Sequence, residues 1–179
     1  LANVSCYPIS NADQFRQQLS RLAVLADYVI AVAPETGNLL GQLAEQLRKY
    51  GANVLLPSAE QISWSSSKFQ TYQKLTEHKV PTPEILNLKE LALLSEDALV
   101  VVKPEFGAGC IDTNVLTASE LSLVVPKSDT LIQPYHSGIN VSVSVIMGAA
   151  PVIMQPLYQQ IKIVDQSLKF MAVENDVAT

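Results

Sequence analysis

The sequence predicts a small parallel α/β domain over residues 1–62, followed by an α+β domain with a mainly antiparallel sheet over residues 63–179. Three observations support this fold class. Helix-like and strand-like segments alternate in the first part, which is typical of a parallel sheet covered by helices. Short strand-like segments dominate from Leu99 onward. The chain of 179 residues is 48% hydrophobic, so it can bury a substantial core.

The first domain should contain two helices that alternate with two strands. A helix that begins after Ser10 or Asn11 has its apolar residues at helical spacing. A strand over 27–34 follows it and is stopped by a proline. The second helix ends at Gly51, because glycine favours helix C-termini, and a strand over 52–57 comes next.

The second domain opens with a run of serines suited to capping a helix that starts near Lys68. That helix should end near His78, because the residue before Pro81 avoids the helical region. "TASE" at 117–120 has the spacing of a capping box and predicts a short helix, and "MGAAP" predicts a hairpin turn. Strands are expected at 99–103, 113–116, 130–133, 139–147, 152–155, 160–164 and 168–173.

Composition excludes several classes of protein. The net charge of −5 gives no clustered positive charge for nucleic acid. No apolar run reaches the roughly 20 residues that span a bilayer. Cys6 and Cys110 do not make a disulfide framework, which favours a reduced cytoplasmic setting. His78 and His136 lie in different segments, so we expect no Cys/His metal site.

The most informative stretch is "VVKPEFGAG", in which Lys103 ends an apolar strand and Gly107 and Gly109 follow it. This stretch has two interpretations. One is an ordinary hairpin loop beside a solvated lysine. The other is a lid whose backbone amides approach phosphates where no side chain intervenes, with the lysine as a compact cation beside them.

Other motifs stand before and after this stretch in a fixed order. A helix that begins with Lys68 leads to "VPTP", then come "VVKP" and the glycine loop, then "LIQPYHSG" and "NVSVSVIMG". In this order the motifs resemble the ATP-grasp superfamily, whose members join a carboxylate to an amine through an acyl phosphate. "KFQTYQKL", "VKPEFGAG" and "VSVSVIMG…PVIMQPLYQQI" resemble in particular the tyramine–glutamate ligases of methanofuran-type coenzyme biosynthesis.

The resemblance assigns Lys68 and Lys103 to the nucleotide phosphates and the loop with Gly107 and Gly109 to a lid. A lysine at a helix N-terminus opposes the helix dipole, and a bound anion would remove that conflict. A solvated first-turn lysine is the alternative. Lys162 is a weaker candidate for a third phosphate contact.

The adenine hinge would be formed by Gln133, Tyr135 and His136. Gln133 replaces the glutamate that is usual in the family, but its carbonyl can still accept from the adenine amino group. His136 is the better backbone donor because Pro134 has no N–H. Tyr135 is as readily a core residue as a contact to the base. Asn140 stands where many members have a glutamate that holds the ribose.

Glu35 and Thr36 lie at the predicted strand end before the second helix, where ligands collect in open α/β sheets. They either cap the helix and favour its dipole or form an anionic site for an amine substrate. The metal ligands of the family are expected beyond the predicted strands, because Glu174, Asn175 and Asp176 have the wrong spacing. We therefore assign no metal ligand and no catalytic residue, and expect the C-terminal metal-binding part to be missing.

These inferences predict an ATP-dependent carboxylate–amine ligase that uses ATP and Mg²⁺, with a carboxylate such as glutamate and an amine as substrates. We expect no nucleic-acid or membrane partner, and a homodimer is one assembly compatible with the sequence. A nucleotide-binding module without catalysis is the alternative. A scaffold that binds no nucleotide is the third interpretation.

Overall fold

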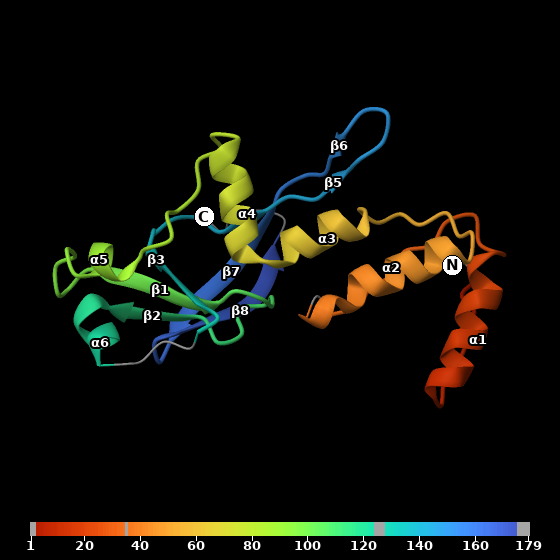
Figure 1. Ribbon diagram of the computed structural model, residues 1–179, viewed down its shortest axis with the longest axis horizontal. Coiled ribbons are helices and arrows are strands. Elements are labelled where there is room, and N and C mark those ends of the chain that lie inside the picture. Colours follow the sequence, from red (N-terminus) through yellow and green to blue (C-terminus); the bar gives the residue numbers. More distant parts are fainter. Residues whose placement is uncertain (1–2, 35, 124–127, 175–179) are drawn as a thin grey trace. The chain divides into compact units, whose positions relative to one another are not determined.

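The computed structural model describes residues 3–34, 36–123 and 128–174. The chain divides into two compact units, Leu1–Thr71 and Tyr72–Thr179 (Figure 1). This division falls within the helix α4 (Lys68–Glu77). The domain boundary after residue 62 stays a prediction.

Two amphipathic helices dominate the first unit. Helix α1 (Ala12–Ala23) begins after Asn11, whose side chain accepts a 2.9 Å hydrogen bond from the backbone N–H of Gln14. Of the two predicted caps, Asn11 is therefore the one that the structure uses. Helix α2 (Leu39–Lys49) ends as predicted near Gly51, which adopts the positive φ of 84° that glycine tolerates.

The two strands predicted in the first unit meet at one parallel bridge, between Val29 and Val54. The N–H of Val29 donates to Asn53 at 2.9 Å, and the N–H of Leu55 donates to Val29 at 2.8 Å. The predicted parallel pairing is thus confirmed, but it is much shorter than 27–34 and 52–57. The described residues of the two segments form no further bridge, and Val32 is 94% exposed.

A helix that the sequence analysis missed lies between the bridge and α4. Helix α3 (Ala59–Ser66) begins with a capping box in which Ser58 and Gln61 each bond the other's backbone. Ser67 then adopts an extended conformation, and its hydroxyl accepts from the N–H of Gln70 at 3.0 Å. The predicted serine cap of α4 is therefore Ser67.

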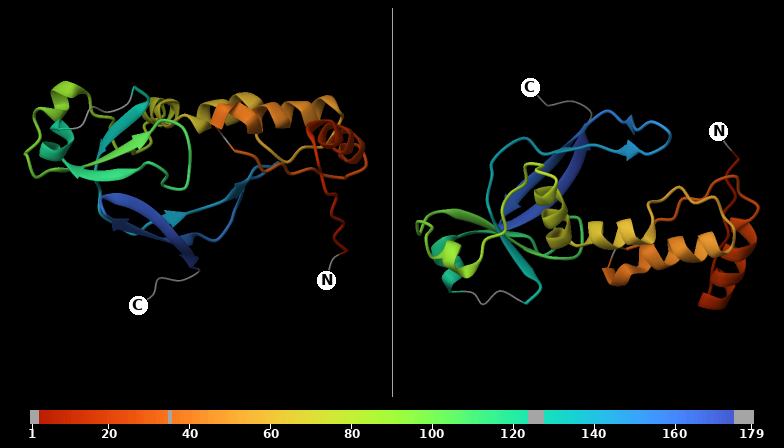
Figure 2. Two further views of the ribbon diagram at one scale, coloured as in Figure 1. Left: turned by 90° about the horizontal axis from the view of Figure 1, so that it is seen from below. Right: turned by 45° about the horizontal axis from the view of Figure 1, so that its top comes forward.

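The second unit is built on a six-stranded antiparallel sheet with the order β3-β1-β2-β8-β7-β4 (Figures 1 and 2). A separate pair, β5 and β6, continues beyond β4 and β7. The strands are β1 (Leu99–Pro104), β2 (Asn114–Thr117), β3 (Thr130–Pro134), β4 (Val141–Ser142), β5 (Val145–Ile146), β6 (Val152–Ile153), β7 (Leu157–Val164) and β8 (Ser167–Glu174). Every predicted strand of this domain is present, except that 139–147 is divided into β4 and β5.

Two short helices and a small apolar cluster cover one face of β1 and β3. Helix α6 (Ala118–Ser122) has the predicted capping box, and α5 (Leu88–Leu91), which was not predicted, has another. The buried cluster consists of Leu86, Val100, Leu121 and Ile132. This packing fixes β1 and β3 from one side, and their other face carries the candidate site. In the part of the chain that the structure describes, no helix has the length and apolar character needed to cross a bilayer.

Candidate functional site

The pairing of β1 places Lys103 on the face of the sheet opposite to the apolar cluster. Lys103 pairs with Leu131, and Val101 pairs with Gln133. Because directly opposite residues share a face and successive residues alternate, Lys103 and Gln133 point to the same side. Val100 and Val102 point to the other side, toward the cluster. The sheet thus brings the predicted phosphate lysine and one hinge residue together.

Several residues of the loop after Lys103 adopt left-handed backbone conformations. Four of its residues have positive φ: Gly107 (105°), Gly109 (71°), Cys110 (60°) and Asp112 (51°). Among the described residues outside the immediate chain neighbours, no atom lies within 4 Å of the position that a Cβ would take at either glycine, so both border open space. The loop joins two antiparallel neighbours, and the predicted hairpin geometry is therefore correct. Its backbone amides can also approach a ligand from this open side.

Gln133 is held by a residue far away in the sequence. Its side-chain nitrogen donates a 2.8 Å hydrogen bond to the carbonyl of Pro83, in the "VPTP" segment. Gln133 is only 9% exposed. The donor side of its amide is thus occupied by protein, which leaves its carbonyl oxygen as the group that can accept from a ligand.

The remaining hinge residues follow β3 directly. The N–H of Tyr135 donates to the carbonyl of Leu99 at 3.0 Å, which extends the pairing of β3 with β1. Tyr135 is half-buried, and the chain becomes exposed at His136. Asn140 is exposed, and its carbonyl accepts from the N–H of Gln159 at 2.8 Å. Tyr135, His136 and Asn140 therefore lie in one continuous segment between β3 and β4.

Lys162 lies on a different face of the same sheet. Asn114 pairs with both Val102 on β1 and Ser167 on β8, and Ser167 pairs with Val164 on β7. These residues share one face, and Lys162, two residues before Val164, shares it as well. Lys162 is therefore on the side of Val102 rather than Lys103. It pairs directly with Lys169, a like charge.

Lys68 is the first residue of α4, as the sequence predicted. It belongs to the first compact unit, and Lys103 belongs to the second. Glu35 lies outside the described residues. Thr36 begins a short 3-10 turn, and the N-cap of α2 is Asn38 rather than Thr36. The expected Thr36 cap is therefore wrong, because Gly37, at φ 67°, turns the chain before α2 begins.

The described residues contain no cluster of acidic side chains. Within residues 3–34, 36–123 and 128–174, no group of three His, Cys, Asp or Glu side chains could hold a metal ion. Glu174 ends β8 and accepts a hydrogen bond from the side chain of Gln160. Asn175 and Asp176 lie outside the described residues. The described residues therefore offer no cluster of acidic ligands for a metal ion.

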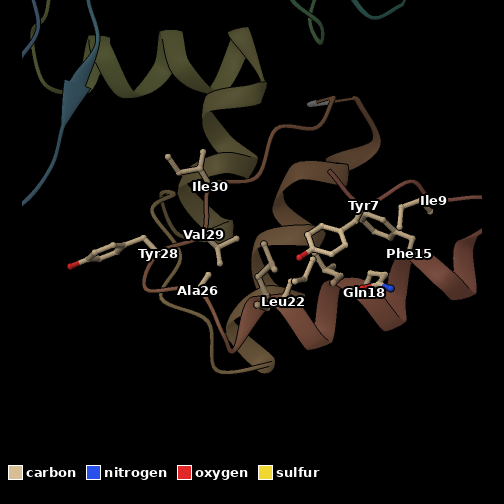
Figure 3. A pocket seen from close by; sticks show the side chains of 12 residues that line it. Tyr7, Ile9, Phe15, Gln18, Leu22, Ala26, Tyr28, Val29 and Ile30 are labelled. Carbon is tan, nitrogen blue, oxygen red and sulfur yellow. The ribbon is translucent and has the colours of Figure 1, made fainter. Parts of the chain in front are cut away.

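A cavity of about 370 Å³ lies away from these residues, in the first unit. Figure 3 shows it between α1, the chain before α1 and the segment that carries Val29. Its lining is mainly apolar, with Tyr7, Phe15, Leu22 and Ile30 among the contributors. No predicted site residue lines it, so it does not add to the candidate site.

Comparison with protein families explains the order of the motifs. A model of the ATP-grasp domain matches residues 65–171, which is more than half of the chain. The chain belongs to the ATP-grasp family. A second model, of the pre ATP-grasp 3 domain, matches residues 1–62. This ATP-grasp chain matches no curated protein sequence.

Solved structures share the fold. An ATP-grasp superfamily protein from Archaeoglobus fulgidus is 24% identical, with a TM-score of 0.60 over 87% of this chain and 44% of that one. The D-alanine–D-alanine ligase from Bacillus anthracis is 17% identical, with a TM-score of 0.60 over 92% of this chain and 58% of that one. The N5-carboxyaminoimidazole synthetase from Staphylococcus aureus, solved with ADP, is 14% identical, with a TM-score of 0.58 over 86% of this chain and 43% of that one. The ATP-grasp chain thus spans about half the length of these proteins.

Proposed function

We propose that this chain is the nucleotide-binding part of an ATP-dependent ligase that joins a carboxylate to an amine. The observation that carries the proposal is the arrangement at the end of β1. Lys103 and the carbonyl side of Gln133 share one face of the sheet, and a loop with two positive-φ glycines begins beside them. Nucleotides require these groups, namely a cation and amides for the phosphates and an acceptor for the adenine amino group.

The proposed reaction has two steps. The γ-phosphoryl group passes from ATP to a carboxylate oxygen, which gives an acyl phosphate and ADP. The amine then attacks the carbonyl carbon, the carbon–oxygen bond to phosphate breaks, and the nitrogen loses a proton. Lys103 and the amides of the loop stabilise the negative charge on the phosphate oxygens, and they form no covalent bond with the substrate.

The base and the sugar would bind to the segment that follows β3. The carbonyl oxygen of Gln133 accepts from the adenine amino group, and the N–H of His136 donates to a ring nitrogen. Tyr135 packs beside the base. Asn140 bonds a ribose hydroxyl, but without the charge of the glutamate that is usual in this family.

Lys68 is proposed as the second phosphate lysine, because its place at a helix N-terminus is favourable for an anion. Lys162 is the weakest of the three proposed phosphate contacts, since the strand pairing places it on the face of the sheet opposite to Lys103. Glu35 and Thr36 are proposed to bind the amine. Mg²⁺ is proposed as a second cofactor that offsets phosphate charge, but no step is assigned to it because the described residues offer no acidic cluster for it.

The finer proposal is that the carboxylate is glutamate and that the enzyme acts in the biosynthesis of a coenzyme in the cytoplasm. It is supported by the likeness of "VKPEFGAG" and "KFQTYQKL" to the tyramine–glutamate ligases. A nucleotide-binding module without catalysis is the second candidate. It is favoured by the neutral Gln133 and Asn140, which stand where the family usually has carboxylates.

Two measurements test the proposal. Calorimetric titration with ATP and Mg²⁺ should show binding, and its absence would contradict both candidates. Release of phosphate is then measured with ATP, Mg²⁺, glutamate and a panel of amines. Release that depends on an amine supports the ligase. No release with any amine would favour the nucleotide-binding module.

A further inference from the structure

The two ends of the loop between β1 and β2 are held by different strands. The last pair of described residues in the register of β1 and β2 is Val102 with Asn114, so Lys103 and Thr113 lie just beyond that register. Lys103 pairs with a residue of β3. The carbonyl of Thr113 instead accepts from the N–H of Leu168, on β8, at 2.8 Å. The position of the far end of the loop therefore depends on β8.

Thr113 is the residue at which the loop joins the sheet. It is only 9% exposed. Its N–H donates to the carbonyl of Cys110 at 3.2 Å, which closes the last turn of the loop. Because the N–H of Thr113 bonds the loop and its carbonyl bonds β8, a displacement of β8 at this point would also displace the end of the loop.

A tight turn at Asp165 and Gln166 brings the start of β8 beside β2. Val164 pairs with Ser167, so the turn is a two-residue hairpin loop, and its φ angles are 48° and 64°. A loop of this kind requires positive φ at both positions, which Asp tolerates but which is unfavourable for the longer side chain of Gln. The carbonyl of Gln166 accepts from the N–H of Val115 at 2.7 Å. The turn therefore contains a residue that its backbone disfavours, at a point where it contacts β2.

The side chain of Gln166 connects this turn to helix α6. Its Nε2 donates to Oε1 of Glu120 at 2.8 Å. The other oxygen of that carboxylate, Oε2, accepts from the N–H of Thr117 at 2.8 Å and from its hydroxyl at 3.0 Å. The capping box thus already orients the carboxylate, so the bond orders only one further side chain. Because Leu121 of α6 belongs to the buried apolar cluster, Gln166 connects the turn to the core of this unit.

We propose that Gln166 is a positioning residue for the loop 105–112. Its bond to Glu120 fixes the turn between β7 and β8, and β8 in turn fixes Thr113, so that the loop closes over the phosphates from an end that is already in place. A loop whose end is fixed loses less conformational entropy when it closes, which favours binding. The inference rests on the proposed function, because it takes this loop to be the lid over a nucleotide.

Two substitutions of Gln166 test the proposal. Gln166→Asn keeps a residue that tolerates positive φ, but its side chain is one methylene too short to reach Glu120. In the free protein the amides of residues 110–113 should exchange about two- to fivefold faster, and the dissociation constant for ATP with Mg²⁺ should rise by about the same factor, as expected for one exposed hydrogen bond. Gln166→Lys restores a donor to the carboxylate of Glu120 and should return both values to near those of the wild type. No recovery with Gln166→Lys would contradict the role of this bond.

Gln160→Asn is the matched control, because the side chain of Gln160 donates to Glu174 at the end of the same hairpin that is remote from its turn. It should change neither measurement. Equal effects of the two asparagine variants, or faster exchange throughout β1 and β3 as well, would show a general loss of stability and contradict a local role. If the wild type binds ATP and Gln166→Asn binds it equally well, Gln166 does not position the lid. If the wild type binds no ATP, the proposed function fails, and this inference fails with it.

Discussion

The side chain of Gln133 donates a 2.8 Å hydrogen bond to the carbonyl of Pro83, although the two residues are 50 positions apart. The bond links the segment before α5 to β3, the strand at one edge of the sheet, and the N–H of Leu86 donates to Ile132 at 2.8 Å in the same region. Gln133 therefore has two roles in the proposed site. It holds the connecting segment against β3, and it presents its carbonyl oxygen on the face that carries Lys103.

Replacing Gln133 with glutamate should separate these two roles. The substitution keeps the shape of the side chain but removes the N–H donor, so an ionised carboxylate would face the Pro83 carbonyl. We expect a loss of about 1–3 kcal/mol in the free energy of unfolding at pH 7, measured with urea. Because the introduced carboxyl is more easily accommodated when protonated, its pKa is raised in the fold and the loss should shrink as the pH falls.

Gln17→Glu provides the control for this experiment, because Gln17 is an exposed residue of α1. It should change the free energy of unfolding little at either pH. If Gln133→Glu is as stable as the wild type at pH 7, the hydrogen bond to Pro83 does not contribute to the fold.

Lys103→Ala should weaken ATP binding. The lysine is at the end of β1, on the face that it shares with Gln133, and a charge-assisted contact with phosphate is worth roughly 1.5–3 kcal/mol. At about 1.4 kcal/mol per tenfold, that range corresponds to an increase of roughly 12- to 140-fold in the dissociation constant, to be measured by calorimetry.

Two further lysines show whether the effect is specific. Lys89 is exposed on α5, and Lys89→Ala should leave the affinity unchanged. Lys162→Ala, which removes the weakest proposed phosphate contact, should raise the dissociation constant less than Lys103→Ala, because Lys162 lies on the opposite face of the sheet from Lys103. An unchanged dissociation constant for Lys103→Ala would remove this residue from the proposed site.

The loop 105–112 should exchange its amide hydrogens rapidly in the free protein and more slowly with ATP. Backbone hydrogen bonds run from the N–H of Glu105 to the carbonyl of Asp129 at 2.7 Å and from the N–H of Thr113 to the carbonyl of Cys110 at 3.2 Å. Lids belong to the least stable parts of a fold, and bound phosphate would order the amides of this loop.

The turn at Asp165 and Gln166 is the internal control for hydrogen exchange, because it also has positive φ angles, of 48° and 64°, but lies between β7 and β8. ATP should not change its exchange. If the loop 105–112 is as protected in the free protein as β1 and β2, it does not act as a lid.

The sequence predicts a helix where residues only a few positions apart form the structure that starts it. The box at Thr117 and Glu120 is confirmed, because both of its bonds span three residues. The boxes at Ser58 and Asn87 carry the same signal but begin short helices of eight and four residues, and these were missed. The bond from Gln133 to Pro83 could not be predicted, since no local pattern specifies a partner 50 residues away.

The capping box of α6 also makes the stability of the second unit dependent on pH. The backbone N–H of Thr117 donates to the carboxylate of Glu120 at 2.8 Å, and the Thr117 hydroxyl donates to it at 3.0 Å. Together with the side chain of Gln166, these donors lower the pKa of Glu120. A lowered pKa in the folded state means that the ionised form stabilises the fold above the pKa of the unfolded chain, about 4.3. That stabilisation is lost as the pH falls through the folded-state pKa.

Glu120→Gln tests this linkage because it keeps a side-chain acceptor for the Thr117 N–H but cannot ionise. The wild type should be more stable than the variant at pH 7, since a carboxylate accepts stronger hydrogen bonds than an amide. The difference should fall steadily below about pH 4.3 as the Glu120 carboxylate is protonated. Urea unfolding of both proteins between pH 7 and pH 3 measures it. A difference that stays constant over this range would mean that the charge of Glu120 does not stabilise α6, and that only the shape of the capping box does.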